Sequence, residues 1–448
     1  MGKRRDQKRS VQGNIIHTQR WVVMSTTLDR IAQLARESPK CQFTSLAHLL
    51  TPEFLMESWS QVNRRGASGI DGESPADFER NLKERCESLV DRLKRNAYQA
   101  PPVKRVNIPK GDGKTRPLGI PTSEDRLLQR AVMRILEAIY EQDFLDCSHG
   151  FRPKRSPHTA LRELRNQFIE GRVRAVFETD IRGFFNHLSH KWLMKMLQVR
   201  IGDTVILRLI GKWLKAGALI DGIVTQTNEG TPQGGPISPL LANIYLHYAL
   251  DLWFQKKMVP FFKRKAYLTR FADDFVATFE QQREAEFFAI AVKERLRDFG
   301  LELAEEKTGL HRFGRMPTLF NEETGSFDFL GFSHHSEKDR AGKYTVVRIP
   351  TAKSCRKFLE KTKSWLLKFR HANRKEQRLA LTSRLTGFYR YFGLHHCTPK
   401  MSKVQREVFR QWRQAIKRQG QRAKAGWQHL MQQRWFVLPR ACVCQPLV

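Results

Sequence analysis

The feature that most constrains this chain is a pair of adjacent aspartates, Asp273 and Asp274, inside the apolar segment Leu268–Thr278. The apolar flanks of the pair suit a β-hairpin. Two neighbouring ionised carboxylates repel each other and are costly to bury, so a structured site with this arrangement needs a cation, and hard divalent ions prefer carboxylate oxygens. A solvated Asp-Asp turn is the alternative that this segment alone leaves open.

A second acidic segment lies upstream, at Val173–His187. It has an apolar, β-leaning start, then Asp180, then the aromatic pair Phe184 and Phe185. A strand that ends in one carboxylate and a later strand that carries two more can bring three acidic groups together. Such a set suits two metal ions, which activate an attacking hydroxyl and stabilise a leaving phosphate oxygen during in-line displacement. Nucleotidyl transfer is a reaction of this kind.

The chain resembles the group II intron-encoded reverse transcriptases, also called intron maturases, in seven motifs that occur in the family's order. RFADDF is similar to the Tyr-x-Asp-Asp box, TDIRGFF to the first catalytic-aspartate motif, and GTPQGGPISPLLANIYLH to the motif between them. The others are IPKGDGKTRPLGIPTSEDR, SHGFRPKRS, GLELAEEKT and FDFLGF. The resemblance runs with gaps from near Phe43 to about Pro439. It implies an α+β fold: a right-hand polymerase with an antiparallel palm sheet, followed by an α-helical thumb or maturase domain.

Charge and helical periodicity support this division of the chain. The formal charge of +34 points to a polyanionic partner. Residues 351–448 alone hold 23 Lys and Arg against 3 Asp and Glu, and their apolar stripes predict a basic helical bundle. We therefore expect a basic N-terminal extension (1–42), an N-terminal fingers extension (43–105), reverse transcriptase fingers and palm (106–344) and a basic helical thumb or maturase domain (345–448).

The resemblance also implies the site residues. The catalytic residues and ligands of two Mg²⁺ ions, for which Mn²⁺ could substitute, are Asp180, Asp273 and Asp274, with Ile181 as a further metal ligand. The nucleotide contacts are Lys110, Arg116, Phe185, Gln233 and Lys307. The primer and template contacts are Arg152, Phe329, Leu330 and Gly331.

Two of these positions carry a specific role. Phe185, five positions after Asp180, packs in the family where a ribose 2′-hydroxyl would sit, and so favours deoxynucleotides; a core phenylalanine is the alternative. Lys307 matches the lysine that protonates the leaving pyrophosphate. Asn186 and Phe271 depart from the usual Asp and Tyr of the family, and we expect neither change to abolish catalysis.

The expected function is RNA-directed DNA synthesis with dNTPs, on an RNA template with a DNA primer, together with binding of intron RNA and assistance in its splicing. A domesticated relative in antiviral defence or DNA repair and a mainly structural splicing cofactor remain open, as does the oligomeric state. No apolar run suggests a signal peptide or a membrane span, so we expect a protein of the bacterial cytoplasm, associated with the nucleoid while it acts on DNA. The seven scattered cysteines predict free thiols, and we expect no C-terminal nuclease domain.

Overall fold

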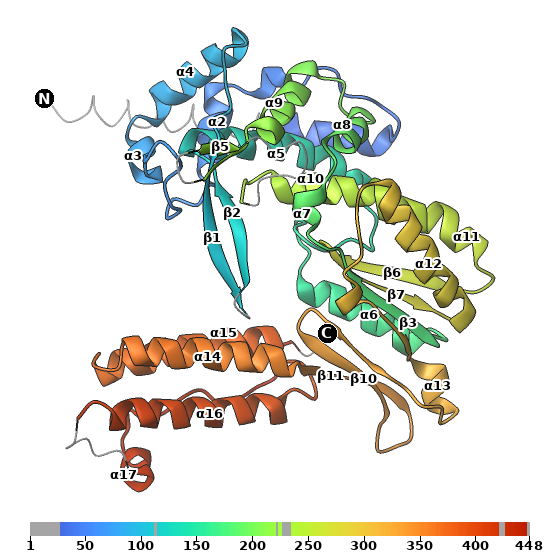
Figure 1. The fold of residues 1–448 in the computed structure, drawn as a ribbon, viewed down its shortest axis with the longest axis vertical. Coiled ribbons are helices and arrows are strands. Elements are labelled where there is room, and N and C mark those ends of the chain that lie inside the picture. Colours follow the sequence, from blue (N-terminus) through green and yellow to red (C-terminus); the bar gives the residue numbers. More distant parts are fainter. Residues whose placement is uncertain (1–26, 112–113, 221–222, 226–233, 421–425, 446–448) are drawn as a thin grey trace, which may run out of the picture. The chain divides into compact units, whose positions relative to one another are not determined.

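The computed structural model describes residues 27–111, 114–220, 223–225, 234–420 and 426–445. It divides into two compact units, each assembled from several stretches of the chain. The first comprises residues 1–153, 181–257 and 292–303, and the second residues 154–180, 258–291 and 304–448. Both contain helices and antiparallel strands (Figure 1), in agreement with the α+β class. Asp180, Asp273 and Asp274 all belong to the second unit.

Helices dominate the first unit. Residues 27–37 are helical. The long helix α5 (Ser123–Asp143) begins where the Thr122 side chain accepts a hydrogen bond from the backbone N–H of Asp125. The other helices are α2 (Pro52–Trp59), α3 (Pro75–Arg80), α4 (Leu82–Lys94), α7 (Phe184–His187), α8 (His190–Gln198), α9 (Thr204–Lys215) and α10 (Ser238–Leu246), the last continued by the π-helical turn His247–Asp251.

The sheet of the first unit has the strand order β2-β1-β4-β5. Its first two strands form a hairpin, in which β1 (Val103–Gly111) pairs antiparallel with β2 (Lys114–Ile120). β1 also pairs parallel with β4 (Ala218–Ile220), which pairs antiparallel with β5 (Ile223–Thr225). The register of the hairpin shifts between Pro109 and Gly111, so a bulge falls at Lys110.

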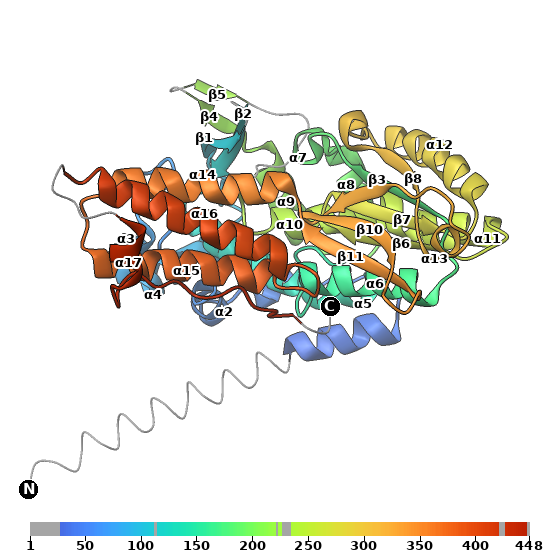
Figure 2. The same ribbon diagram turned by 90° about the horizontal axis from the view of Figure 1, so that it is seen from below.

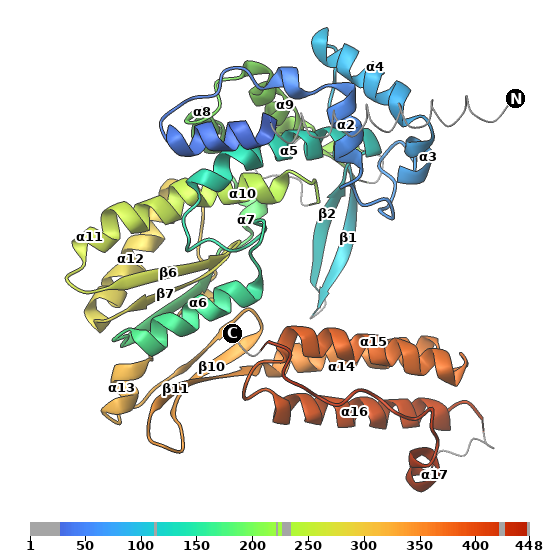
Figure 3. The same cartoon turned by 180° about the vertical axis from the view of Figure 1, so that it is seen from behind.

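A four-stranded antiparallel sheet forms the first half of the second unit. Its order is β6-β7-β3-β8, from β6 (Ala266–Phe271), β7 (Asp274–Phe279), β3 (Ala175–Asp180) and β8 (Gly309–Arg312). Helix α6 (Pro157–Glu170) covers one face (Figure 3), where Gln167 donates to Thr269 Oγ1 and accepts from Thr278 Oγ1. On the opposite face Phe177 packs against Phe288 of α12 (Gln282–Asp298).

The rest of the second unit is a three-stranded sheet and a helical bundle. The sheet has the order β11-β10-β9, from β9 (Ser326–Phe329), β10 (Phe332–Lys338) and β11 (Tyr344–Pro350). Helices α14 (Ala352–Lys368), α15 (Arg374–Phe392) and α16 (Thr398–Lys417) lie side by side (Figure 2) around the fully buried Trp412. The indole N–H of Trp412 donates to Gln377 at 2.8 Å. Shorter helices are α11 (Val259–Phe261), α13 (Arg315–Leu319) and α17 (Trp427–Met431). The π-helical turn Phe254–Met258, which precedes α11, lies at the boundary between the two units.

The described residues also bear on the expectations for membrane-spanning helices and for the cysteines. None of the helices within those ranges is both long and apolar enough to cross a bilayer. All seven cysteines are free thiols, as predicted.

Candidate active site

The three predicted catalytic carboxylates meet at one end of the second unit's sheet. Asp180 is the last residue of β3, and its ladder partner is Asp274, the first residue of β7. The two-residue turn Ala272-Asp273 joins β6 to β7 and places Ala272 in the left-handed region at φ +58°. Cross-strand partners share one face of a sheet, so Asp180 and Asp274 project to the same side. The expected hairpin and the expected juxtaposition are therefore both observed.

Lys307 is the cation that the chain itself supplies to these carboxylates. It ends the 3-10 turn Glu305–Lys307, and the backbone N–H of Ala304 just before it donates to the carbonyl oxygen of Asp180 at 2.8 Å. Its ammonium donates to Oδ2 of Asp180. Burial lowers the pKa of Lys307, but the hydrogen bond and charge of Asp180 and the charges of Asp274 and Asp273 outweigh it, so the net shift is upward.

Asp274 shows that the negative charge of this cluster exceeds what one lysine balances. Burial and the carboxylates of Asp180 and Asp273 raise its pKa well above the ordinary value, while Lys307 opposes the shift. The donor set is all carboxylate, which fits a hard divalent cation. Within the described ranges no group of three or more His, Cys, Asp or Glu side chains already has the spacing of a metal site. The chemistry of the residues thus fits cations, although the side chains are not arranged around one.

Phe329, Leu330 and Gly331 lie at the tip of the β9–β10 hairpin. Leu330 and Gly331 form its two-residue turn, with φ of +51° and +79°, and Phe329 pairs with Phe332. A turn with two left-handed residues matches the twist of a tight hairpin. Tyr391 of α15, which the sequence did not single out, donates from its hydroxyl to the carbonyl oxygen of Leu330 at 3.0 Å. Burial and, next, the charge of Asp274 raise the pKa of Tyr391.

Residues 108–334 match the family model described as reverse transcriptase (RNA-dependent DNA polymerase). The chain belongs to the reverse transcriptase family. That match contains all three aspartates and Lys307.

Relatives connect this reverse transcriptase with group II introns. It is 32% identical over 381 residues to protein YkfC of Escherichia coli, an alignment that covers 78% of this chain and 98% of YkfC. It is 42% identical over 236 residues to the group II intron-encoded protein LtrA of Lactococcus lactis, covering 52% of this chain and 39% of LtrA. It is also 31% identical over 129 residues to nuclear intron maturase 1 of Arabidopsis thaliana, covering 27% of this chain and 18% of that protein. The predicted kinship with the group II intron type is confirmed.

Arg152 is engaged in packing within the first unit. Its guanidinium is buried, donates to Glu141 at 3.0 Å, and donates to the carbonyl oxygens of Leu145 and Ser148 at 2.8 and 2.9 Å. It also lies over the ring of Phe144. All three of its nitrogen atoms have protein partners, so this geometry gives Arg152 a structural role in the first unit.

The structure describes the predicted nucleotide-contact residues of the first unit to different extents. Arg116 is an exposed residue of β2, paired with Ile108, whereas only the backbone of Lys110 is described. Phe185 is half-buried and packs edge-on against Phe184 at 5.5 Å. Gln233 lies outside the described residues.

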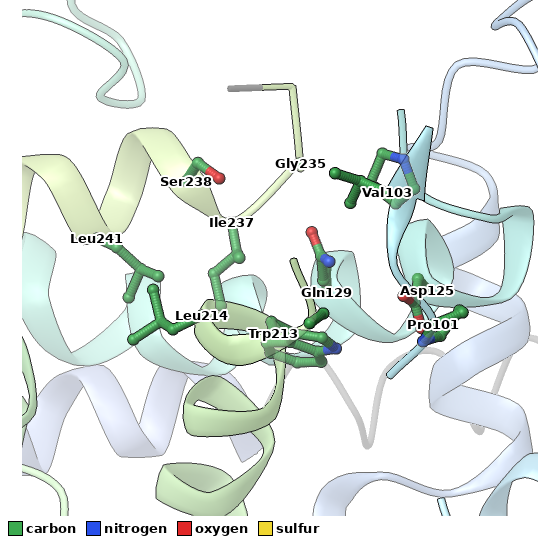
Figure 4. A pocket seen from close by; sticks show the side chains of 12 residues that line it. Pro101, Val103, Asp125, Gln129, Trp213, Leu214, Gly235, Ile237, Ser238 and Leu241 are labelled. Carbon is green, nitrogen blue, oxygen red and sulfur yellow. The ribbon is translucent and has the colours of Figure 1, made fainter. Parts of the chain in front are cut away.

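The glycines that follow position 233 allow close backbone packing inside the reverse transcriptase. Gly234 has φ +125°, and a Cβ there would lie 2.5 Å from the carbonyl oxygen of Gly119 in β2. A Cβ at Gly235 would lie 2.6 Å from Oε1 of the buried Gln129, whose amide points toward Gly235 across a small cavity (Figure 4). In the described part of this motif the glycines thus serve contacts with β2 and α5, a role that the sequence did not reveal.

A buried acid lines the same cavity. Asp125 of α5 accepts a hydrogen bond from the hydroxyl of Tyr98, which in turn accepts one from the indole N–H of Trp213 at 2.8 Å. Burial is the main reason that the pKa of Asp125 rises to about 7. This network joins α5, α9 and the segment before β1, so it supports the base of the fingers hairpin.

Proposed function

We propose that Asp180, Asp273 and Asp274, with the main chain of Ile181, hold two Mg²⁺ ions, for which Mn²⁺ can substitute, and that the chain copies an RNA template into DNA from a DNA primer. When bound, such ions activate the primer 3′-hydroxyl and stabilise charge on the departing pyrophosphate. The pairing of β3 with β7 holds Asp180 and Asp274 opposite each other. The observation that carries this proposal is the register that pairs Asp180 with Asp274 while Lys307 contacts Asp180.

Lys307 has two tasks in this mechanism. Without a nucleotide, its ammonium reduces the repulsion among the three carboxylates. With a nucleotide present, it can turn from Asp180 toward the pyrophosphate and donate a proton to the leaving oxygen. While it contacts Asp180, its raised pKa keeps it protonated, so the lysine carries a proton before the nucleotide arrives.

Selection of the incoming nucleotide falls to residues of the first unit. We propose that Phe185 excludes the ribose 2′-hydroxyl. Its ring is half-buried and packs edge-on against Phe184, which fixes the position of the ring and so supports this role. Arg116 offers a bidentate fork to the triphosphate and Lys110 a point charge, with Gln233 contributing to nucleotide position. The exposed position of Arg116 on β2 supports its part in this proposal.

Contact with nucleic acid falls to the hairpin turn and the helical bundle. The turn Leu330-Gly331, with Phe329 before it, is the proposed contact for the primer end. The bundle α14–α16 belongs to the segment that holds 23 basic and 3 acidic residues, which supports its proposed role as the thumb that holds the template–primer duplex and binds intron RNA. Splicing assistance would then follow from RNA binding and would not need the aspartates.

Primer extension on an RNA template tests the proposal. We expect wild-type protein with Mg²⁺ to extend a DNA primer with dNTPs and not with rNTPs, and Asp273→Ala to bind RNA without extending the primer. Phe185→Val is the matched test of sugar selection and should raise rNTP incorporation. Full extension by Asp273→Ala would refute the assignment of the site. Splicing promoted by Asp273→Ala would show that the maturase role is separate.

A further inference from the structure

Glu178 connects the catalytic strand to the hairpin that carries the Leu330-Gly331 turn. It lies in β3, two residues before Asp180, and therefore projects to the same face. One carboxylate oxygen accepts from the backbone N–H of Asp328 in β9 at 3.0 Å. The other lies 3.0 Å from Nε2 of His311 in β8, the separation of a hydrogen bond in which the imidazole donates. β9 belongs to the other sheet, so this carboxylate bridges the two sheets of the second unit.

Two glycines make room for the imidazole in this arrangement. A Cβ at Gly309, the ladder partner of Glu178, would lie 2.3 Å from Nε2 of His311. A Cβ at Gly325 would lie 3.3 Å from Nδ1 of the same ring. A side chain at Gly309 would push His311 away from Glu178, so the glycine permits the contact. We call the group Glu178, His311 and the Asp328 N–H the carboxylate clasp.

The clasp acts on a hairpin whose tip is fixed at its other side. Tyr391 donates to the carbonyl oxygen of Leu330, and the backbone N–H of Thr351 donates to that of Gly331 at 2.9 Å. Asp328 is separated from the turn only by Phe329. The tip therefore depends on the bundle on one side and on the Asp180 strand, through Glu178, on the other.

We propose that Glu178 is a positioning residue for the primer strand, because it fixes the turn at a set distance from the carboxylate cluster. This inference rests on the proposed function of that turn as a primer contact. Glu178 acts by accepting hydrogen bonds, not through its charge, although its charge also contributes to raising the pKa of Asp274. A glutamine can accept the Asp328 N–H through its oxygen while its amide NH2 donates to Nε2 of His311 in the other imidazole tautomer, whereas an alanine can do neither.

Steady-state extension by Glu178→Ala and Glu178→Gln tests this role. Loss of the acceptor for the Asp328 N–H should raise the KM for primer–template about tenfold in Glu178→Ala, with kcat and the KM for dNTP nearly unchanged. Glu178→Gln should stay close to wild type. Gly309→Ala, which displaces the imidazole while keeping the carboxylate, should show a smaller increase and serves as an independent variant if Glu178→Ala fails to fold.

Hydrogen exchange gives a readout that needs no activity. The Asp328 amide should exchange about tenfold faster in Glu178→Ala than in wild type or Glu178→Gln. Equal exchange in all three proteins overturns the clasp, and an unchanged KM for primer–template overturns its effect on the primer. If Glu178→Gln is as impaired as Glu178→Ala, the role is one of charge and the inference is wrong. A wild-type protein that extends no primer would remove the proposed function, while exchange at Asp328 would still decide whether the clasp exists.

Discussion

Asp203 and Asp274 are both aspartates at the start of a regular element, and their surroundings shift their pKa values in opposite directions. Asp203 caps α9, and its carboxylate accepts four backbone N–H groups, those of Leu46, Ala47, Val205 and Ile206. Burial alone would raise its pKa, but these hydrogen bonds outweigh burial and the pKa is lowered. Asp274 begins β7 beside Asp180 and Asp273, and its pKa is raised.

The ionised carboxylate of Asp203 therefore stabilises the fold, whereas that of Asp274 destabilises it. Backbone N–H donors of the protein stabilise the ionised form of Asp203. The ionised form of Asp274 has two carboxylate neighbours, with Lys307 as the opposing charge. A carboxylate cluster like that of Asp274 needs added positive charge, which is why we assign the catalytic chemistry to this cluster.

The largest expected effect comes from Asp274→Asn. This change removes one of three repelling charges while keeping the side-chain shape, so DNA synthesis should fall by about a thousandfold or more, since the site loses a cation ligand. In EDTA the melting temperature should stay equal or rise, because the repulsion is relieved. Single-turnover extension and thermal unfolding measure the two effects. A clear loss of stability in EDTA would place Asp274 with Asp203 as a structural residue.

Asp203→Ala should do the reverse. Loss of a helix cap and of its charge-assisted hydrogen bonds should lower the free energy of unfolding by about 2–3 kcal/mol. The extension rate per folded molecule should not change, because the four backbone groups that Asp203 binds do not belong to the proposed site residues. Denaturant unfolding gives the free energy of unfolding, and active-site titration gives the extension rate per folded molecule. A strong loss of rate in fully folded protein would contradict the comparison.

Lys307→Gln should give an intermediate effect. Loss of the proposed general acid should reduce the maximal rate about tenfold. The Mg²⁺ concentration that gives half-maximal rate should fall, because the ammonium no longer competes with the cation at Asp180. A Mg²⁺ titration of extension, with the exposed Lys338→Gln as a matched control, checks both. A higher Mg²⁺ requirement in Lys307→Gln would show that the lysine assists cation binding.

The smallest effect concerns acid stability. Because the folded pKa of Asp203 is lowered below its ordinary value of 3.8, its contribution is complete above that value and is lost as the pH falls through the lowered pKa. Melting temperatures of wild type and Asp203→Asn should therefore converge below about pH 4. An unchanged difference from pH 7 to pH 3 would show that the hydrogen bonds of Asp203 do not depend on its charge.

Local patterns predicted much of the site. The apolar flanks of Asp273-Asp274 predicted a hairpin, which is present. This feature depends on residues close in the chain, where turn chemistry and alternation decide the structure. Asp180 is grouped with Asp273 and Asp274 because it follows an apolar segment that predicts a strand, and the observed ladder places it opposite Asp274.

Contacts between distant residues were not predictable in the same way. Glu141, the side-chain acceptor of Arg152, lies eleven residues upstream on α5 and outside the motif SHGFRPKRS, so the motif gave no sign that its arginine is buried. Glu178 meets His311 and Asp328 across 133 and 150 residues, and no local pattern marks those partners. The two compact units also combine separate stretches, whereas the sequence suggested four consecutive segments whose boundaries remain a prediction.

The central claim is that the carboxylate cluster is completed by divalent cations, and counting bound Mn²⁺ tests it most directly. Electron paramagnetic resonance can count the ions bound to the protein with primer, RNA template and a non-hydrolysable dNTP, for wild type, Asp274→Asn and Asp203→Asn. We predict two ions in wild type and in Asp203→Asn, and fewer in Asp274→Asn. The same number of ions in all three proteins would contradict the account.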